Sequence, residues 1–217
     1  MRVLGVLWDM DGVLVDTSEF HFQAWHDVLA AHGFSFTREV HRQVFGMNNH
    51  GILSRVLGDK FTPELLSEIG DQKEEQFRAA VRGHARPLPG VRTWLQRLQE
   101  AGARQAVASS APMANIAALI DELGLRPYFD AIVPGADLPG KPEPVLFLKA
   151  AQALGLQPED CVVIEDAIAG VAAAKQAGMK CIAVMTTNPA EALSAADLIV
   201  ERLDALPEDA FRRLGSV

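Results

Sequence analysis

The stretch from Val3 to Thr17, VLGVLWDMDGVLVDT, joins an apolar run to two carboxylates and a glycine. The apolar run predicts a buried strand that ends at Asp9. Asp11 follows two residues later, and Gly12 allows the chain to turn sharply where the strand ends. Neighbouring carboxylates repel each other unless a cation lies between them or one of them holds a proton. The stretch therefore predicts either a site for an oxygen-loving ion such as Mg²⁺ or a polar turn after a strand.

Composition narrows the class of protein. The chain has 217 residues, a formal net charge of −8 and no basic cluster beyond short pairs, so we expect neither nucleic acid nor an anionic membrane as a partner. Cys161 and Cys181 lie inside apolar runs, which argues against a disulfide framework and favours the reducing cytoplasm. The first apolar run is interrupted by Asp9 before it is long enough for a signal peptide, and no segment is long enough to span a bilayer. We expect a cytoplasmic protein.

The region between residues 17 and 86 predicts helices and no strands. Asp16 and Glu19 have the spacing of a capping box, which predicts the start of the first helix. The pair Thr62-Pro63 predicts the start of a later helix, because a hydroxyl can cap it and proline suits its first turn. The segment from Pro87 to Gly90 is too stiff and broken to continue that helix, and we interpret it as a hinge.

From residue 91 onward, short apolar runs alternate with helical patterns. The runs predict strands at 105–108, 129–133, 161–164, 181–184 and 198–200. Strands that alternate with helices at this spacing predict a parallel sheet covered on both faces. The expected fold is an α/β, Rossmann-like parallel-sheet core formed by residues 1–16 and 87–217, with an inserted helical cap at residues 17–86.

Polar side chains follow four of the predicted strands, at the edge of an open parallel sheet where ligands bind. They are Asp9 and Asp11 after the first strand, Ser109 and Ser110 after the second, Lys141 one loop after the third, and Glu165 and Asp166 after the fourth. A hydroxyl at a helix N-terminus can bind a phosphate oxygen, a lysine can balance its charge, and carboxylates can hold Mg²⁺. Each feature alone is also typical of a helix cap, a surface loop or a solvated turn. Together they favour phosphoryl transfer.

The motifs resemble those of the haloacid dehalogenase superfamily, and within it those of the β-phosphoglucomutase-like phosphatases and mutases. The matching segments are DMDGVLVDT at 9–17, FHFQAW at 20–25, VASS at 107–110, GKPEP at 140–144 and VIEDAIAG at 163–170. They follow one another over essentially the whole chain. The second aspartate of the first segment distinguishes phosphoryl-transfer members from dehalogenases and phosphonate-cleaving members.

The resemblance implies a Mg²⁺-dependent enzyme in which Asp9 is the nucleophile and forms an aspartyl-phosphate. It implies that Asp11 first protonates the leaving oxygen and later acts as the base, so that Asp11 must hold a proton when it first acts. The implied binding sets are Ser109, Ser110 and Lys141 for the phosphoryl group, and Asp9, Glu165, Asp166 and the backbone carbonyl of Asp11 for the metal.

The resemblance also identifies the helical insert as a mobile cap that closes over the substrate. Lys73 falls within the apolar stripe of its helix, and we expect either a lysine that snorkels at the edge or one that points toward the substrate. His21 resembles a mutase histidine that couples substrate binding to the acid–base aspartate, with a partly solvated surface histidine as the alternative.

One position of the cap departs from the mutases, which have an arginine where this sequence has Asn49. An arginine fork suits a bisphosphate intermediate better than a neutral amide does, whereas Asn48, Asn49 and His50 can hydrogen-bond a sugar hydroxyl. We therefore expect a phosphatase of small phosphorylated sugars or polyols, active as a monomer or weak dimer. A β-phosphoglucomutase that interconverts glucose 1-phosphate and glucose 6-phosphate is the alternative. A non-catalytic phospho-acceptor module is disfavoured by the long helical insert.

Overall fold

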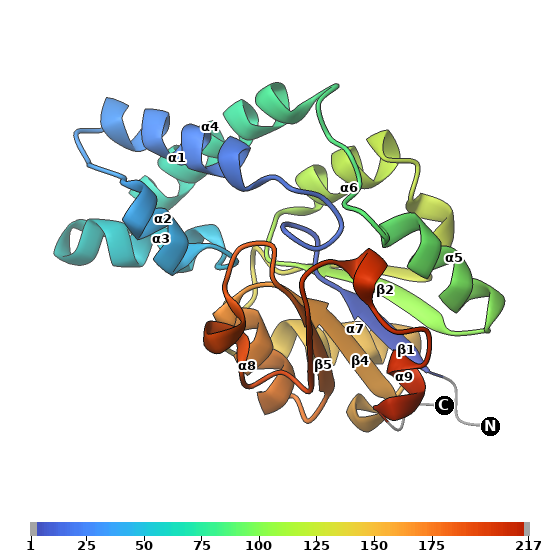
Figure 1. Cartoon of the computed structure of the whole chain (residues 1–217). Helices are drawn as coiled ribbons and strands as arrows, with labels where there is room; N and C mark the ends of the chain where they lie inside the picture. The colour runs from blue at the N-terminus through green and yellow to red at the C-terminus, as the bar shows by residue number, and fades with distance from the viewer. Residues whose placement is uncertain (1–3, 215–217) are drawn as a thin grey trace.

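The structure is a computed structural model of the chain and describes residues 4–214. Four helices of the first third of the chain form a cap beside a core that contains the sheet (Figure 1). Short 3₁₀ segments lie at Gly58–Lys60, Arg126–Tyr128, Pro158–Asp160, Ala190–Leu193 and Leu203–Ala205.

The core is built on a six-stranded sheet with the strand order β3-β2-β1-β4-β5-β6. All strand pairs are parallel. The strands are β1 (Gly5–Trp8), β2 (Arg104–Ser109), β3 (Ala131–Pro134), β4 (Cys161–Glu165), β5 (Lys180–Val184) and β6 (Leu198–Val200). The central strand β1 places Trp8 opposite Val107 on one side and Ile164 on the other. The α/β fold class predicted from the alternating pattern is confirmed, and the ends of β2 to β6 lie within two residues of the predicted ones.

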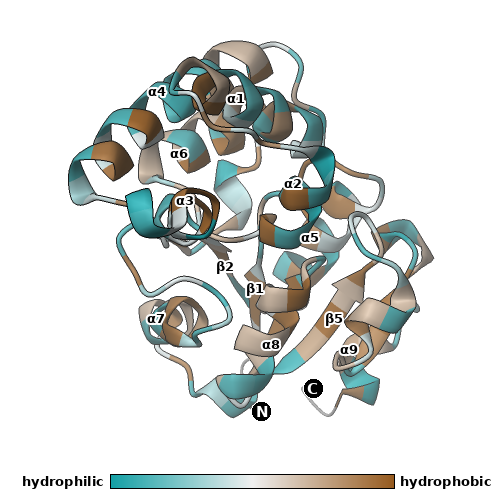
Figure 2. Ribbon diagram, turned by 90° about the vertical axis from the view of Figure 1, so that its left-hand side faces the viewer, coloured by the Kyte–Doolittle hydropathy of each residue, from teal (hydrophilic) through white to brown (hydrophobic). Residues whose placement is uncertain are grey.

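Helices cover both faces of the sheet. Successive side chains of a strand point to opposite faces, and both sets are buried here. Val6 and Trp8 pack with α5 (Val91–Glu100), α6 (Met113–Glu122) and the C-terminal α9 (Ala210–Arg213). Leu7 packs on the other face with α7 (Val145–Leu154) and α8 (Ile168–Gln176). Hydrophobic residues accordingly colour much of the central strands (Figure 2).

The cap has its own hydrophobic core. Its helices are α1 (Ser18–Ala31), α2 (Arg38–Val44), α3 (Asn49–Leu57) and α4 (Pro63–Val81). Trp25, Leu53 and Ile69 come from three of these helices and are buried against one another. The predicted start of α4 is confirmed, because Thr62 Oγ1 accepts a hydrogen bond from the Leu65 N–H at 3.2 Å and Pro63 occupies the first turn.

The capping box predicted for α1 is wrong. Thr17 is the N-cap residue, and its side chain makes no capping hydrogen bond. Glu19 instead forms two hydrogen bonds with Arg38, at 2.7 and 2.8 Å. The Thr17 hydroxyl bonds to the Asp11 carboxylate, so the site competes with the helix for its capping group.

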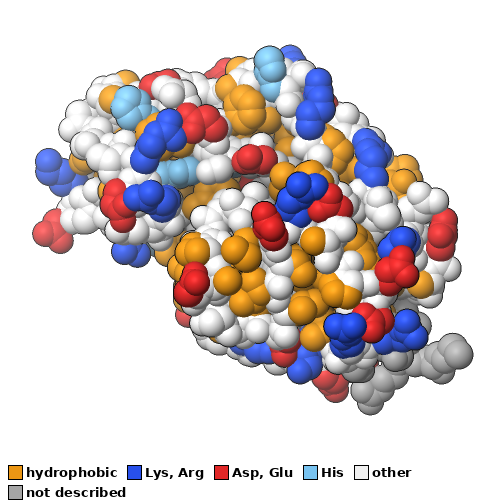
Figure 3. Space-filling view, in the orientation of Figure 1, with side chains coloured by type: hydrophobic (Ala, Val, Ile, Leu, Met, Phe, Trp, Pro, Cys, Tyr) orange, Lys and Arg blue, Asp and Glu red, His pale blue; other side chains and the backbone are white. Residues whose placement is uncertain are grey.

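Two chain segments connect the cap to the core, and they are joined to each other. The Leu88 N–H donates to Leu14 O at 3.0 Å, and Pro87 pairs with Val15 in an isolated bridge. The start of α1 and the end of α4 are therefore held above the end of β1. Acidic and basic side chains are interspersed on the face shown in Figure 3. Within residues 4–214, no helix combines the length and the apolar character of a transmembrane segment.

Candidate active site

The end of β1 meets the end of β4 and the loop after β3 beneath the cap. The Asp9 N–H donates to Ile164 O at 3.0 Å, which fixes the first strand end against the fourth. Lys141 Nζ lies 2.6 Å from Asp9 Oδ1 and 2.5 Å from Glu165 Oε1, and its side chain is fully buried. Residues from three separate segments of the chain thus form one buried ion-pair cluster, with Asp9 lying 132 positions from Lys141 in the sequence, as the order of the predicted strands leads us to expect.

Glu165 uses both carboxylate oxygens. Oε1 binds Lys141, and Oε2 accepts the N–H groups of Asp166 and Ala167 at 2.7 Å each. A Cβ atom at Gly170, in the first turn of α8, would overlap this carboxylate. The glycine therefore allows the carboxylate to lie against the start of the helix, and Glu165 positions Lys141.

One carboxylate oxygen of Asp166 is left without a hydrogen-bond partner among the described residues. Thr187 Oγ1 donates to Asp166 Oδ2 at 2.5 Å, whereas Asp166 Oδ1 is buried without a hydrogen-bond partner. Asp9, Glu165 and Asp166 each offer an oxygen within 4.8 Å of the others. Burial, followed by the charges of Glu165 and Asp9, raises the pKa of Asp166 well above its usual value. Oxygen donors that repel one another suit a hard divalent cation such as Mg²⁺, so these residues fit a metal.

Gly12 makes this approach possible. Its φ is +88°, a conformation that L side chains rarely adopt, and a Cβ atom there would overlap the Asp166 carboxylate. The glycine that follows the two aspartates is thus needed for the turn and for the space beside Asp166.

The pKa of Asp9 also indicates that the site lacks positive charge. Burial, followed by the charges of Glu165 and Asp11, raises the pKa of Asp9 to about 8, although Lys141 lowers it. Burial acts against the charged form of Lys141, but Asp9 and Glu165 raise the pKa of Lys141 above its usual value. Asp9 is therefore short of positive charge for ionisation at neutral pH, even beside a charged lysine.

Asp11 turns toward the cap and is not one of the three clustered acids. Its Oδ1 accepts a hydrogen bond from Thr17 Oγ1 at 2.5 Å and lies 3.2 Å from His21 Nε2. Burial alone would raise the pKa of Asp11, but the charge of His21 and the hydrogen bonds from His21 and Thr17 lower it below its usual value. This arrangement favours the ionised form, whereas the implied acid role begins from the protonated form.

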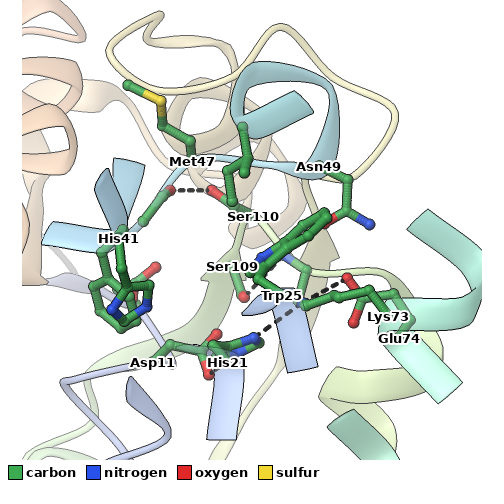
Figure 4. A pocket seen from close by; sticks show the side chains of 15 residues that line it. Asp11, His21, Trp25, His41, Met47, Asn49, Lys73, Glu74, Ser109 and Ser110 are labelled. Atoms are coloured by element: carbon green, nitrogen blue, oxygen red, sulfur yellow. Dashed lines mark hydrogen bonds and ion pairs between the residues drawn. The ribbon is translucent and has the colours of Figure 1, made fainter. Parts of the chain in front are cut away.

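The cap supplies a chain of polar contacts to Asp11 (Figure 4). Lys73 Nζ lies 3.0 Å from His21 Nδ1 and 2.9 Å from Glu74 Oε1, and it is 2% exposed. Because a charged lysine only donates, Nδ1 of a neutral His21 ring accepts from Lys73, and Nε2 then carries the hydrogen that faces Asp11. The His21 ring stacks on Phe77 with centroids 3.9 Å apart. Lys73 thus lies inside the cap rather than snorkelling at its edge, and His21 connects the cap with Asp11.

Glu74 and Asn115 extend this chain back to the core, and sequence reasoning missed both. Glu74 Oε2 accepts a hydrogen bond from Asn115 Nδ2 of α6 at 2.5 Å. Asn115 Oδ1 accepts one from Arg78 Nη1 at 2.8 Å. Glu74 and Arg78 are four residues apart on α4, a spacing that indicates a common face, but no sequence signal singles out Asn115.

The two serines after β2 have different partners. Ser109 is 1% exposed, and its Oγ accepts the Ala111 N–H at 3.2 Å just before α6 begins. Ser110 Oγ donates to Gly46 O at 2.8 Å, so it binds the cap (dashed in Figure 4). Both serines line the pocket, and Ser110 also contributes to the contact between cap and core.

A narrow pocket of about 50 Å³ lies where these groups meet. Asp9, Asp11, Ser109, Lys73 and Asn49 are among the residues that line it. Asn48 does not line it, since its side chain bonds to the core, and His50 packs edge-on against the Phe61 ring with centroids 5.1 Å apart. Of Asn48, Asn49 and His50, which the sequence offered for hydroxyl binding, Asn49 is the one that the structure places in the pocket.

His41 is a further lining residue that the sequence did not indicate. Its Nε2 is buried without a hydrogen-bond partner, and its ring packs against Phe45 with centroids 5.3 Å apart. Burial, followed by the charge of His21, lowers the pKa of His41 to about 4. His41 therefore contributes a neutral ring to the wall of the pocket.

Comparisons with known proteins agree with this architecture. A family model described as haloacid dehalogenase-like hydrolase matches residues 3–178. Over 210 residues the chain is 32% identical to a Bacillus subtilis β-phosphoglucomutase, covering 93% of this chain and 90% of that protein. It is 33% identical over 187 residues to an Escherichia coli fructose-1-phosphate phosphatase, covering 84% of this chain and 97% of that protein.

A longer chloroplast phosphatase of Arabidopsis thaliana is 32% identical over 206 residues, and the match spans 94% of this chain but 55% of that protein. Among solved structures, a β-phosphoglucomutase from Clostridium difficile superposes with a TM-score of 0.88 at 25% identity. The superposition covers 98% of this chain and 96% of that chain. The fold is thus shared with a solved mutase, and the relatives that the sequence matches include phosphatases and a mutase.

Proposed function

The chain belongs to the haloacid dehalogenase-like hydrolases, and on this premise we propose that it is a Mg²⁺-dependent phosphohydrolase of small sugar or polyol phosphates. The observation that carries the proposal is the setting of Asp9. It shares the buried Lys141 with Glu165, in the same acidic group where Asp166 keeps an unpartnered oxygen. A carboxylate in such a setting can act as a nucleophile once positive charge favours its ionised form.

In the first step, an Asp9 oxygen attacks the phosphorus atom of the ester. The new bond gives an aspartyl-phosphate, and the bond from phosphorus to the ester oxygen breaks. Lys141, 2.6 Å from Asp9, places positive charge beside the transferring group, and Ser109 offers a hydroxyl next to the N-terminus of α6. In the second step, water attacks the phosphorus atom and releases inorganic phosphate and the free Asp9 carboxylate.

Asp11 handles the proton in both steps. It donates a proton to the departing ester oxygen and later accepts one from the attacking water. A phosphoryl dianion in the pocket raises the pKa of a nearby carboxyl group, which favours the acid form before the first step. After the ester leaves, the hydrogen bonds from Thr17 and His21 favour the ionised form that the second step needs.

Asp9, Glu165 and Asp166 would hold the metal. Bound Mg²⁺ supplies positive charge that favours ionised Asp9 and offsets the charge of the phosphoryl group. The closed cap excludes bulk water from the reaction, and its pocket wall contacts the rest of the substrate.

A phosphomutase is the second candidate, since mutases are among the relatives. The pocket wall favours the hydrolase. Among the residues that line the pocket, Lys73 is the one lysine or arginine, and Glu74 pairs with it at 2.9 Å. Asn49 adds an amide without charge. The second phosphate of a bisphosphate intermediate would find no free cation there, whereas sugar hydroxyls would find hydrogen-bonding groups.

Phosphorus NMR distinguishes the two reactions. The protein is incubated with MgCl₂ and either fructose 1-phosphate or β-glucose 1-phosphate, the latter with a trace of glucose 1,6-bisphosphate. We expect inorganic phosphate as the phosphorus-containing product. Conversion of β-glucose 1-phosphate to glucose 6-phosphate would establish the mutase instead. The Asp9→Asn variant is the control for contaminating phosphatases.

A further inference from the structure

The cap loop, defined here as residues 46–48, contacts the core through Asn48. Asn48 Nδ2 donates to Leu138 O at 2.9 Å and lies 3.4 Å from both Gly135 O and Ala136 O. The side chain is buried, with the residue 4% exposed. One amide group of the cap thus faces three carbonyl oxygens of a single core segment.

The same side chain begins helix α3. Asn48 Oδ1 accepts the Gly51 N–H at 3.0 Å, and Asn48 is the N-cap residue. Its oxygen therefore serves the cap, and its nitrogen serves the core. Neither atom is free to bind a ligand, so Asn48 lies outside the substrate contacts.

The core segment, residues 135–140, leads directly to Lys141, and we call it the lysine loop. A Cβ atom at Gly140 would lie 3.0 Å from Asn48 Oδ1, so the residue before the lysine packs closely against the Asn48 amide. At its other end, the Gly135 N–H donates to Ser109 O at 2.7 Å. The lysine loop therefore connects Asn48 with two residues of the proposed phosphoryl site.

The rest of the cap loop lies against the chain that follows β2 and β4. Ser110 Oγ, after β2, donates to Gly46 O at 2.8 Å. A Cβ atom at Gly46 would lie 2.9 Å from the Cβ atom of Ala167, which follows Asp166. Three consecutive cap residues thus include contacts to the segments that carry Ser109, Lys141 and Asp166.

We infer that Asn48 is a positioning residue that couples the seating of the cap to the position of the lysine loop, and hence to Lys141. When the cap is seated, the Asn48 amide donates a hydrogen bond to the lysine loop. When the cap lifts, the loop loses this donor and Lys141 loses part of its support. The catalytic consequence rests on the proposed function, whereas the coupling itself concerns the contacts alone.

The Asn48→Asp variant separates the two functions of the side chain. A carboxylate can still accept the Gly51 N–H, but it has no hydrogen for Leu138 O and repels the nearby carbonyls. Asn48→Ser also keeps a capping oxygen, and its hydroxyl is too short to reach the loop. Thr62→Asp is the matched control, because it adds the same charge at the N-cap of α4, another cap helix.

Hydrogen–deuterium exchange of peptides that cover residues 135–141 is the direct readout. We expect exchange in these peptides to quicken about tenfold in Asn48→Asp and Asn48→Ser, while peptides of α3 change little. Thr62→Asp should exchange as the wild type does. With p-nitrophenyl phosphate and MgCl₂, we expect kcat/KM to fall about tenfold in both Asn48 variants, with little change in Tm.

Unchanged exchange at residues 135–141 in both Asn48 variants would overturn the inference, and so would an equal rise in Thr62→Asp. If Asn48→Asp does not fold, Asn48→Ser decides. Absence of any phosphatase activity in the wild type would contradict the proposed function, while the exchange experiment would still decide whether Asn48 holds the lysine loop.

Discussion

The two walls of the pocket are built in opposite ways. On the core side, Asp9 lines the pocket and shares the buried Lys141 with Glu165, while Asp166 of the same acidic group keeps one oxygen without a partner. On the cap side, Lys73 is matched by Glu74, and His21 and Asn115 add hydrogen bonds to this pair. The core wall therefore has an excess of acidic groups, whose negative charge a divalent cation would offset. The cap wall has its lysine and glutamate paired with each other and serves to position groups.

The core wall should show the largest effect on turnover. Asp9→Asn removes the nucleophilic oxygen but preserves the size of the side chain, so turnover should fall at least about 10⁴-fold. Phosphate release from an active ester with MgCl₂ measures the loss. Asp130→Asn is the control, because Asp130 binds the Gln105 N–H at the start of β2, away from the site. Asp9→Asn activity within tenfold of the wild type would contradict the account.

The cap wall should show the largest effect on stability. Lys73→Met leaves the buried Glu74 carboxylate without its cation, which should lower the free energy of unfolding by about 3 kcal/mol. Urea denaturation measures this change. Lys60→Met is the control, because Lys60 is exposed and lies 5.6 Å from the Phe34 ring centroid. A loss for Lys73→Met no greater than that of the control would show that the cap pair is not the balanced unit described here.

Mg²⁺ should change the free energy of unfolding only through the carboxylates on the core side of the pocket. In the wild type, saturating MgCl₂ should raise the free energy of unfolding by about 2.7 kcal/mol at a hundredfold excess over Kd, and Asp166→Asn should abolish the rise. In EDTA the variant should be more stable than the wild type, because one repelling carboxylate is gone. Asp59→Asn, on the cap surface, should respond to Mg²⁺ as the wild type does. Thermal denaturation tests each point, and a full Mg²⁺ response in Asp166→Asn would remove Asp166 from the metal site.

The same repulsion sets a pH dependence for the metal-free protein. Because folding raises the pKa of Asp9 from 3.8 to about 8, the folded chain holds a proton that the unfolded chain has released between those values. This group therefore removes stability as the pH rises through that window. Asp9→Asn should cancel this contribution in EDTA, which urea denaturation at several pH values can measure. An identical pH dependence in the two proteins would contradict it.

His41, on the cap side, should give the opposite dependence of folding stability on pH. This is the smallest of the expected effects. Because folding lowers the pKa of His41 from 6.5 to about 4, the unfolded chain takes up a proton first as the pH falls. Folding stability should therefore decline through that window because of this group. His41→Phe, among the rings of Phe22, Phe36 and Phe45, should reduce the decline, whereas the exposed His26→Gln should not. Equal declines in the wild type and His41→Phe would exclude His41 as their source.

The two walls also differ in how well sequence predicts them. Asp9, Glu165 and Asp166 directly follow apolar runs, and parallel strands bring their carboxyl ends to one edge, so their proximity follows from the pattern alone. Thr187, which holds Asp166, lies in a loop with no motif, and only the folded chain brings it there.

The cap side depends on how helices dock, which local sequence does not specify. Asn48 and Asn49 are neighbours of the same type, yet one binds the lysine loop and the other lines the pocket. Which asparagine faces which way depends on the direction from which α3 meets the core. The Thr17 side chain likewise does not cap α1, because its hydroxyl donates to Asp11 instead. This contact forms only once the turn between the two residues has folded.

The most direct test of the account is to trap the covalent phosphoryl group during turnover. The protein is mixed with MgCl₂ and an active phosphate ester, quenched in acid and reduced with borohydride, which converts an aspartyl-phosphate to homoserine. We predict homoserine at position 9 by peptide mass spectrometry, and none when the ester is omitted. Turnover without modification at position 9, or modification of another aspartate, would contradict the claim that Asp9 is the nucleophile.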